Sequence, residues 1–146
     1  MDDGFKRVTI HNDSDIVSAR TAAREMAERL GFTAIDVVLI ATAVSAVARN
    51  IVEHAKRGEI VLSTQQHGKD SGLEIVAQDK GPGIANVTEA LQEGYSTTRG
   101  LGLGLPGMRR LMDEFAIVSR VGSGTKVTMR KWLNGPHEGF RPAGGR

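Results

Sequence analysis

Weak alternation of apolar and polar residues at the N-terminus gives way to a helical repeat. Residues 5–10 alternate and predict a short opening strand. The next segment places its apolar residues on one helical face as far as Leu30, and Gly31 is suited to ending the helix there. The candidate N-cap residues of this helix are Asn12, Asp13 and Ser14.

A second helix is predicted from Thr33 to about Ala55. Asp36 lies three residues after Thr33, in a position similar to that of a capping box. The segment ends in two basic residues followed by Gly58, which predicts a C′ glycine at the helix end.

One side of this second helix carries a polar stripe with a single apolar member. At about 100° per residue, the stripe lies opposite an apolar face that must be core. Ala46 is its apolar member and lies one turn before Asn50. The stripe is either the solvated side of a surface helix or the lining of a buried site, where the amide of Asn50 can bind a hard cation. Its residues are Thr42, Ser45, Ala46, Arg49, Asn50 and Glu53.

The rest of the chain reads as strands, turns and short helices, which with the two long helices predicts an α+β fold. Helices gathered on one face of an antiparallel or mixed sheet form a two-layer sandwich. Further strands are expected at Glu59–Gln66, Leu73–Gln78, Ile117–Val121 and Lys126–Trp132, with turns at Gly68–Gly72 and Gly122–Gly124, helices at Asn86–Glu93 and Leu105–Phe115, and a polar loop at Tyr95–Arg99.

Length and composition are those of one ordinary globular domain. The chain has 146 residues, and we expect the domain to span residues 1–133, followed by a disordered Gly/Pro-rich tail over 134–146. It has no cysteine and no signal pattern, which predicts a cytoplasmic protein. The longest apolar stretch, Val37–Ala41, is far below the ~20 residues of a membrane span, so no membrane association is expected.

The charge balance argues against a nucleic-acid partner. A net charge of +2 is small, and aromatic residues make up only 4% of the chain, too few for base-stacking platforms. A modest positive balance would also suit a polyanion such as ATP. An open sheet face leaves both a monomer and a homodimer compatible with the sequence.

Two glycine clusters suggest a nucleotide site. Residues 102–107 match G-x-G-x-x-G, but a polar loop precedes them in place of a strand, so a dinucleotide-binding fold is excluded. No Gly-Lys-Ser/Thr is present, which excludes a Walker P-loop. Consecutive glycine amides at the start of a helix can still bind phosphates, although a flexible loop with a helix cap gives the same pattern.

Asp79 begins the other cluster, Asp79-Lys80-Gly81-Pro82-Gly83, directly after an apolar strand. Its carboxylate can accept a hydrogen bond from an adenine amino group, with Gly81 and Gly83 leaving room for the base. Taken alone, the same residues are typical of a simple turn.

Taken together and in order, these motifs resemble the ATPase superfamily of gyrase, Hsp90, histidine kinases and MutL, whose fold is the Bergerat (GHKL) type. The small size is similar to that of the anti-sigma-factor serine kinases, and residues 43–51 and 104–115 are very similar to the serine kinases of the bacterial stressosome. The resemblance covers roughly residues 5–132. The motifs are Asn50, residues 79–83, residues 100–104 and Gly124-Thr125.

The resemblance implies a role for each matching residue. Asn50 would hold Mg²⁺ against the triphosphate of ATP, and Asp79 would bind the adenine amine with support from Thr125. Gly81 and Gly83 would line the base pocket. The phosphates would be bound by Gly100, Gly102 and Gly104, beneath a lid that includes Ser96 and Thr97. The γ-phosphate would pass to a serine of a STAS-domain partner, and the freed kinase would activate a downstream phosphatase or other output protein by binding it.

Ala46 departs from the family pattern. The family places a glutamate at this position, four residues before the Mg²⁺-binding asparagine, as general base for the attacking hydroxyl. Loss of a positioned base typically costs about 10²–10⁴ in rate. Glu53 lies one turn beyond Asn50 and is a poor substitute. The sequence therefore predicts nucleotide binding with weak phosphotransfer.

Three other functions compete with this one. The absent base favours a catalytically inactive adaptor that sequesters its partners. An ATP hydrolase of the gyrase type needs a transducer domain that 146 residues leave no room for. A metalloenzyme is disfavoured, because the four histidines lack ligand spacing. They are His11, His54, His67 and His137.

Overall fold

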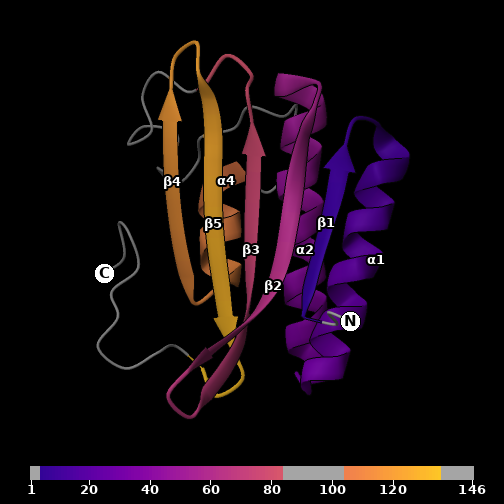
Figure 1. The fold of residues 1–146 in the computed structure, drawn as a ribbon, viewed down its shortest axis with the longest axis vertical. Helices are drawn as coiled ribbons and strands as arrows, with labels where there is room; N and C mark the ends of the chain where they lie inside the picture. Colours follow the sequence, from indigo (N-terminus) through magenta and orange to yellow (C-terminus); the bar gives the residue numbers. More distant parts are fainter. Residues whose placement is uncertain (1–3, 84–103, 136–146) are drawn as a thin grey trace.

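The computed structural model describes residues 4–83 and 104–135, which form a five-stranded antiparallel sheet with helices on one face (Figure 1). The strand order is β1-β2-β3-β5-β4, and every pairing between these strands is antiparallel. The predicted α+β two-layer fold is confirmed. The strands are β1 (Phe5–Ile10), β2 (Gly58–His67), β3 (Asp70–Asp79), β4 (Glu114–Arg120) and β5 (Gly124–Trp132).

Helix α1 (Asp13–Leu30) begins and ends where the sequence predicts. Asn12 is its N-cap, and the side chain of Asn12 and that of Asp15 form a reciprocal capping box. Gly31 ends the helix in the left-handed conformation, with a φ of 98°. The buried face of α1 packs against α2 and the sheet, while its charged face is exposed.

Helix α2 (Ala34–Asn50) continues into the π-helical turn η1 (Ile51–Ala55). The Thr33 hydroxyl accepts a hydrogen bond from the backbone N–H of Asp36 at 3.1 Å, which confirms the predicted start. The end differs from the prediction, because Lys56 and not a glycine leaves the helix with a positive φ of 75°. Gly58 instead begins β2.

The combined helix Ala34–Ala55 is long and apolar enough to cross a membrane by length and composition alone. In the fold it lies between α1 and α4 (Gly104–Leu111) and packs on the sheet. Its apolar character is therefore explained by its place in the core. Seven of its residues in α2 are buried: Val37, Ile40, Ala41, Ala43, Val44, Val47 and Ala48.

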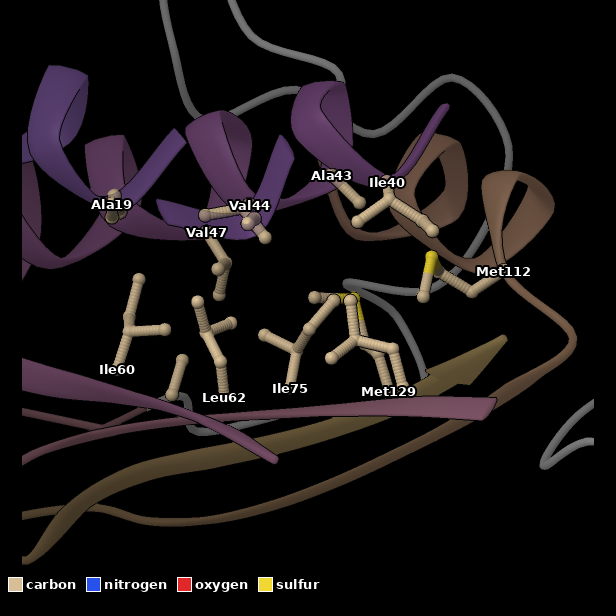
Figure 2. Packing of buried hydrophobic residues seen from close by; sticks show 14 of the residues in the cluster. Ala19, Ile40, Ala43, Val44, Val47, Ile60, Leu62, Ile75, Met112 and Met129 are labelled. Carbon is tan, nitrogen blue, oxygen red and sulfur yellow. The ribbon is translucent and has the colours of Figure 1, made fainter. Parts of the chain in front are cut away.

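The hydrophobic core lies between the helices and the inward face of the sheet (Figure 2). Val44 and Val47 of α2 point toward Ile60 and Leu62 of β2, while Met129 lies beside Ile75 and Met112 beside Ile40. Full burial of such a side chain contributes roughly 1.5–3 kcal/mol. This layer fixes α2 over the sheet and so fixes the height of its C-terminal end above β3.

Several predicted elements have different bounds in the structure, among them β4 and β5, which begin before the expected Ile117 and Lys126. The helix expected over Leu105–Phe115 ends at Leu111, and Phe115 is a buried residue of β4. Phe115 fits the helical spacing, but the inward alternation of β4 places it in the core just as well. The hairpin β2–β3 is longer than expected, with ladder pairs from Gly58–Asp79 to His67–Asp70, so its turn contains only Gly68 and Lys69. The predicted short helix at Asn86–Glu93 lies outside the described residues.

Candidate nucleotide site

The candidate site is built around the last residue of β3. Alternation along β3 places Leu73, Ile75 and Ala77 in the core. Asp79 follows at the same two-residue spacing and therefore lies on the same helix-facing side of the sheet. It is half-buried. Asp79 pairs with Gly58 of β2 on one side and with Thr125 of β5 on the other. A carboxylate is thus held at the end of the core, between the sheet and the helix layer.

One oxygen of this carboxylate is already bonded. The backbone N–H of Gly81 donates to Asp79 Oδ1 at 2.8 Å, which closes a turn of the kind that the sequence also suggested. Oδ2 has no hydrogen bond with any residue that the structure describes. The turn and the binding role are therefore compatible, since the turn orients the carboxylate and leaves Oδ2 as an acceptor.

Thr125 is directly opposite Asp79, as the predicted supporting role requires. Its hydroxyl lies 2.7 Å from that of Ser119 on β4, and Ser119 also donates to the carbonyl oxygen of Gly124 at 3.2 Å. Ser119 was not predicted from the sequence. The strand register alone brings it beside Thr125, on the same inward face.

The glycines near Asp79 are required by close packing with other parts of the chain. A Cβ on Gly81 would lie 2.6 Å from Cβ of Ala55, and one on Gly83 would lie 2.1 Å from the Arg120 carbonyl oxygen. Gly124, with a φ of 105°, would meet the Asp79 carbonyl oxygen at 2.0 Å. These glycines therefore let η1 and the β4–β5 turn approach the end of β3, in addition to any room they leave for a base.

Asn50 lies near this end of the sheet because α2 and β3 finish on the same side of the molecule (Figure 1). It is the last residue of α2 and is half-buried. Five residues later, Ala55 touches Gly81. At about 1.5 Å per residue, this places Asn50 within roughly 8 Å of that contact along the helix axis.

Ala46, one turn before Asn50, is half-buried and packs against the hydrophobic core. Beside it, Ser45 Oγ is buried and has no hydrogen-bond partner among the described residues. Glu53 lies in η1 with an exposed side chain, 3.9 Å from the His54 ring. No carboxylate of the polar stripe therefore lies on the turn of helix where the family has its general base.

The donor set fits Mg²⁺ only in company with phosphate oxygens. No cluster of three or more His, Cys, Asp or Glu side chains that could hold a metal occurs among the described residues. Mg²⁺ is commonly held by one or two protein oxygens together with waters and substrate phosphates. Asn50, at the end of α2, could supply one such ligand through its side-chain oxygen.

The second glycine cluster falls mostly outside the described residues, which include neither Ser96 and Thr97 nor Gly100 and Gly102. Gly104 is the first residue of α4, as expected for a glycine that opens a helix. Pro106 follows within the first turn, where its missing N–H removes no helical hydrogen bond. α4 packs against α2, so its N-terminal end belongs to the same helix layer as Asn50.

Exposed cations surround the end of the sheet that carries Asp79. They come from the η1–β2 connection, from β4 and β5, and from the residue after Asp79, and none forms an ion pair within the described part of the chain. Positive charge at this edge attracts a polyanionic ligand. These residues are Lys56, Arg57, Lys80, Arg120 and Lys126.

Comparison with known proteins agrees with this geometry. A family model for the histidine kinase-like ATPase domain matches residues 11–131, so the chain belongs to that family of ATPase domains. Within it, the chain is 44% identical over 126 residues to serine/threonine-protein kinase RsbT of Bacillus subtilis (strain 168), covering 86% of this chain and 95% of that protein. The chain is thus an RsbT-like member of the family, which confirms the resemblance to stressosome serine kinases.

More distant matches include an anti-sigma factor and two solved structures. Anti-sigma F factor of Caldanaerobacter subterraneus subsp. tengcongensis is 32% identical over 119 residues, with 79% of this chain and 83% of that protein covered. The RsbU and RsbW domains of a Mycobacterium tuberculosis protein match with a TM-score of 0.57 at 21% identity, over 87% of this chain and 31% of that one. The catalytic domain of histidine kinase ThkA matches with a TM-score of 0.52 at 14% identity, over 88% of this chain and 96% of that one. These two structures support the fold alone.

Proposed function

We propose that this protein is an ATP-dependent serine/threonine kinase and partner-switching regulator. It transfers the γ-phosphate of ATP to a serine of a STAS-domain partner and then activates a downstream phosphatase or other output protein by binding it. The similarity to RsbT and to anti-sigma F factors supports a protein kinase that works through changing partners. We place this activity in the cytoplasm and assign it to a monomer or homodimer.

In this proposal, Asp79 Oδ2 accepts a hydrogen bond from the adenine amino group. The observation that carries the proposal is that Oδ2 has no hydrogen bond to any described residue, while Oδ1 is held by the Gly81 N–H. Thr125 supports the contact from the adjacent strand, and Asn50 holds Mg²⁺ against the triphosphate. The glycines of the second cluster, with Ser96 and Thr97, bind the phosphates and close over them.

We further propose that phosphotransfer is slow because of Ala46. The serine hydroxyl of the partner must lose a proton as it attacks the γ-phosphorus, and a carboxylate at position 46 would accept that proton. Ala46 cannot, and Glu53 lies beyond Asn50 on an exposed surface. The expected deficit is about 10²–10⁴ in rate. Nucleotide affinity is retained, because it depends on other residues.

The test is an Ala46→Glu variant, assayed for phosphoserine on a STAS-domain substrate with ATP and Mg²⁺. We expect a gain of about 10²-fold or more in the transfer rate, with little change in ATP affinity. Ala22→Glu is the matched control, because Ala22 is also a half-buried helical alanine packed against the core. An Ala46→Glu protein that folds and binds ATP but transfers no faster than the control contradicts the role given to position 46.

A second candidate is a catalytically inactive adaptor that binds nucleotide and sequesters partners, and Ala46 is the observation that favours it. Calorimetry and a phosphotransfer assay together separate three cases. A kinase or a nucleotide-gated adaptor binds ATP with a dependence on Mg²⁺, whereas a plain adaptor binds neither ATP nor ADP. Slow but measurable phosphoserine formation by the unaltered protein distinguishes the kinase from both adaptors.

A further inference from the structure

Helix α2 changes its hydrogen-bonding pattern at the residue after Asn50. The backbone N–H of Lys56 donates to the carbonyl oxygen of Ile51 at 2.8 Å, a bond that spans five residues where an α-helix spans four. Lys56 then leaves the helix with a φ of 75°, and it is the only non-glycine residue with positive φ in the described part of the chain. This π-helical turn, η1, lies between the two candidate binding residues Asn50 and Asp79.

The last residue of η1 supports the loop that orients Asp79. A Cβ on Gly81 would lie 2.6 Å from Cβ and 2.8 Å from Cα of Ala55, so the backbone of Gly81 rests directly on Ala55. The N–H of the same Gly81 is bonded to Asp79 Oδ1. A displacement of Ala55 is therefore transmitted through Gly81 to the carboxylate.

The first residue of η1 packs near the base of the same side chain. A Cβ on Gly58 would lie 3.0 Å from Cγ2 of Ile51 and 3.1 Å from Cβ of Asp79. Gly58 thus leaves the space in which Ile51 and Asp79 approach each other. Both ends of η1 are in contact with the surroundings of Asp79, while Glu53 and His54 between them are exposed.

The π-helical geometry allows one helix both to carry Asn50 and to place Ala55 against the loop that orients Asp79. Each residue of an α-helix advances the direction of the next side chain by about 100°. The five-residue turn includes one residue more than an α-helical turn, so the residues after it are rotated relative to a regular continuation. Asn50 keeps the side-chain direction set by the regular turns of α2. Ala55 is rotated about the helix axis relative to that regular continuation, and this rotation places it under Gly81.

We propose that η1 is a positioning element for adenine recognition, with Ala55 as the positioning residue that sets the Asp79 carboxylate through Gly81. The inference rests on the proposed ATP binding and deepens it. It assigns η1 to the adenine end of the ligand and leaves the phosphate end to Asn50 and the second glycine cluster. The two ends of the nucleotide are thereby held at a fixed separation by a single helix.

The decisive variant is Ala55→Val, which adds two methyl groups against Gly81. The control is Ala116→Val, because Ala116 is exposed on β4 and faces away from the helix layer. Affinities are measured by calorimetry for Mg²⁺-ATP, for Mg²⁺-GTP and for Mg²⁺-tripolyphosphate, which has no base. Thermal unfolding is recorded for each protein to separate binding from stability.

For Ala55→Val we expect ATP affinity to fall about tenfold, with tripolyphosphate affinity unchanged and the preference for ATP over GTP reduced. Ala116→Val should leave all three affinities as they are. A merely structural role for Ala55 would lower ATP and tripolyphosphate affinity together, and that result overturns the proposal. So does a folded Ala55→Val protein with unchanged ATP affinity.

A second variant covers the case in which Ala55→Val does not fold. Ala55→Gly removes the supporting Cβ without adding volume, and hydrogen exchange at the Gly81 amide then reports the hydrogen bond to Asp79. We expect that amide to exchange faster in Ala55→Gly than in the unaltered protein, and an unchanged exchange rate contradicts the inference.

If the unaltered protein binds neither ATP nor tripolyphosphate, the proposed function fails. If it binds both and the variants match it, only the role of η1 fails.

Discussion

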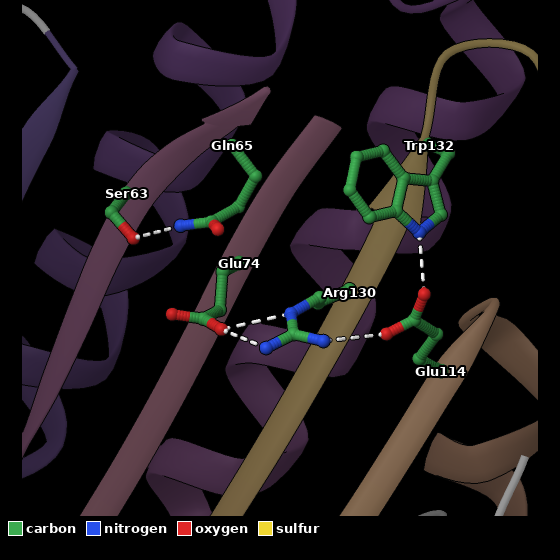
Figure 3. Close-up of polar contacts among 6 residues, drawn as sticks. All are labelled: Ser63, Gln65, Glu74, Glu114, Arg130 and Trp132. Carbon is green, nitrogen blue, oxygen red and sulfur yellow. Dashed lines mark hydrogen bonds and ion pairs between the residues drawn. The ribbon is translucent and has the colours of Figure 1, made fainter. Parts of the chain in front are cut away.

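The two ends of the sheet use polar residues in opposite ways. At one end, Glu74, Arg130 and Glu114 lie across three strands, and Arg130 bonds to both glutamates (Figure 3). At the other end, Asp79 keeps one oxygen without a partner in the described residues, and the nearby cations are exposed. The first end is satisfied within the chain, whereas the second leaves an acceptor, Asp79 Oδ2, that a ligand could use.

The satisfied end is a continuous network. Arg130 bonds to Glu74 at 2.8 Å and to Glu114 at 2.8 Å, and the Trp132 indole donates to Glu114 at 2.7 Å. Burial of Arg130 would lower its pKa, but the hydrogen bonds to Glu114 and Glu74 outweigh burial and raise it. The buried Glu114 therefore has an ionic and a neutral donor, one for each oxygen.

The contrast suggests a division between stability and binding. Buried polar groups that are fully bonded stabilise the fold, while an acceptor left open costs stability unless a ligand uses it. Substitutions at the network should change unfolding and not nucleotide affinity, and substitutions near Asp79 should change affinity. Four variants test this, from the largest expected effect to the smallest.

Gly124→Ala should have the largest effect, because Gly124 takes part both in strand packing and in the candidate site. The new Cβ would meet the Asp79 carbonyl oxygen at 2.0 Å, at a φ of 105°. We expect a loss of about 3 kcal/mol or more in the free energy of unfolding, and weaker ATP binding. Gly122→Ala is the control. The φ of Gly122 is also positive, at 83°, but no atom lies within 4 Å of the Cβ that the substitution would add. Urea unfolding of the pair measures the difference, and equal losses would contradict the packing argument.

Arg130→Met should destabilise the protein by about 2 kcal/mol, because it leaves the carboxylates of Glu74 and Glu114 without their cation. The estimate is below that for a fully buried pair, because the Arg130 side chain is 38% exposed. ATP affinity should not change. A variant with normal unfolding and weakened ATP binding would show that the two ends of the sheet are not separate in function.

Asp79→Asn should weaken ATP binding by roughly 10- to 30-fold, or about 1.5–2 kcal/mol, with less effect on unfolding. The amide keeps an acceptor for the Gly81 N–H but presents an NH₂ donor where Oδ2 was, opposite the adenine amine. Calorimetry with ATP measures this, and Asp13→Asn in the exposed first turn of α1 is the control. ATP binding that survives Asp79→Asn unchanged would remove Asp79 from the site.

Lys56→Gly should have the smallest effect and the opposite sign. Glycine adopts the φ of 75° without steric cost, and the gain exceeds the entropy that glycine adds to the unfolded chain. We expect the free energy of unfolding to rise by up to about 1 kcal/mol. Lys69→Gly, in the exposed β2–β3 turn, is the comparison for a lysine-to-glycine change elsewhere. A loss of stability in Lys56→Gly would mean that the lysine side chain outweighs its backbone conformation.

Local sequence signals determined most of the fold. The capping residues Asn12 and Thr33 and the terminal Gly31 set helix ends that the structure confirms, because each signal acts within a few residues of chain. Alternation likewise located the strands to within a few residues. It was less useful at Phe115, where helical and strand spacing both predict a buried residue and only strand pairing decides.

The family of the protein was also readable from the sequence. Asn50, Asp79 and the glycines form an ordered set of motifs whose resemblance to one ATPase superfamily is confirmed by the comparisons. The individual roles of these residues stay predictions. Ala46 stood out in the same way, as an apolar residue in a polar stripe.

Only the tertiary structure decided how these residues are held. The pairing of Thr125 with Asp79, the Ser119 hydroxyl beside it and the contact of Ala55 with Gly81 all join residues from different elements. No local preference encodes such contacts, because they depend on strand register and on the phase of a helix after a π-helical turn. The sequence determined which groups are available for binding, and packing determined where each of them lies.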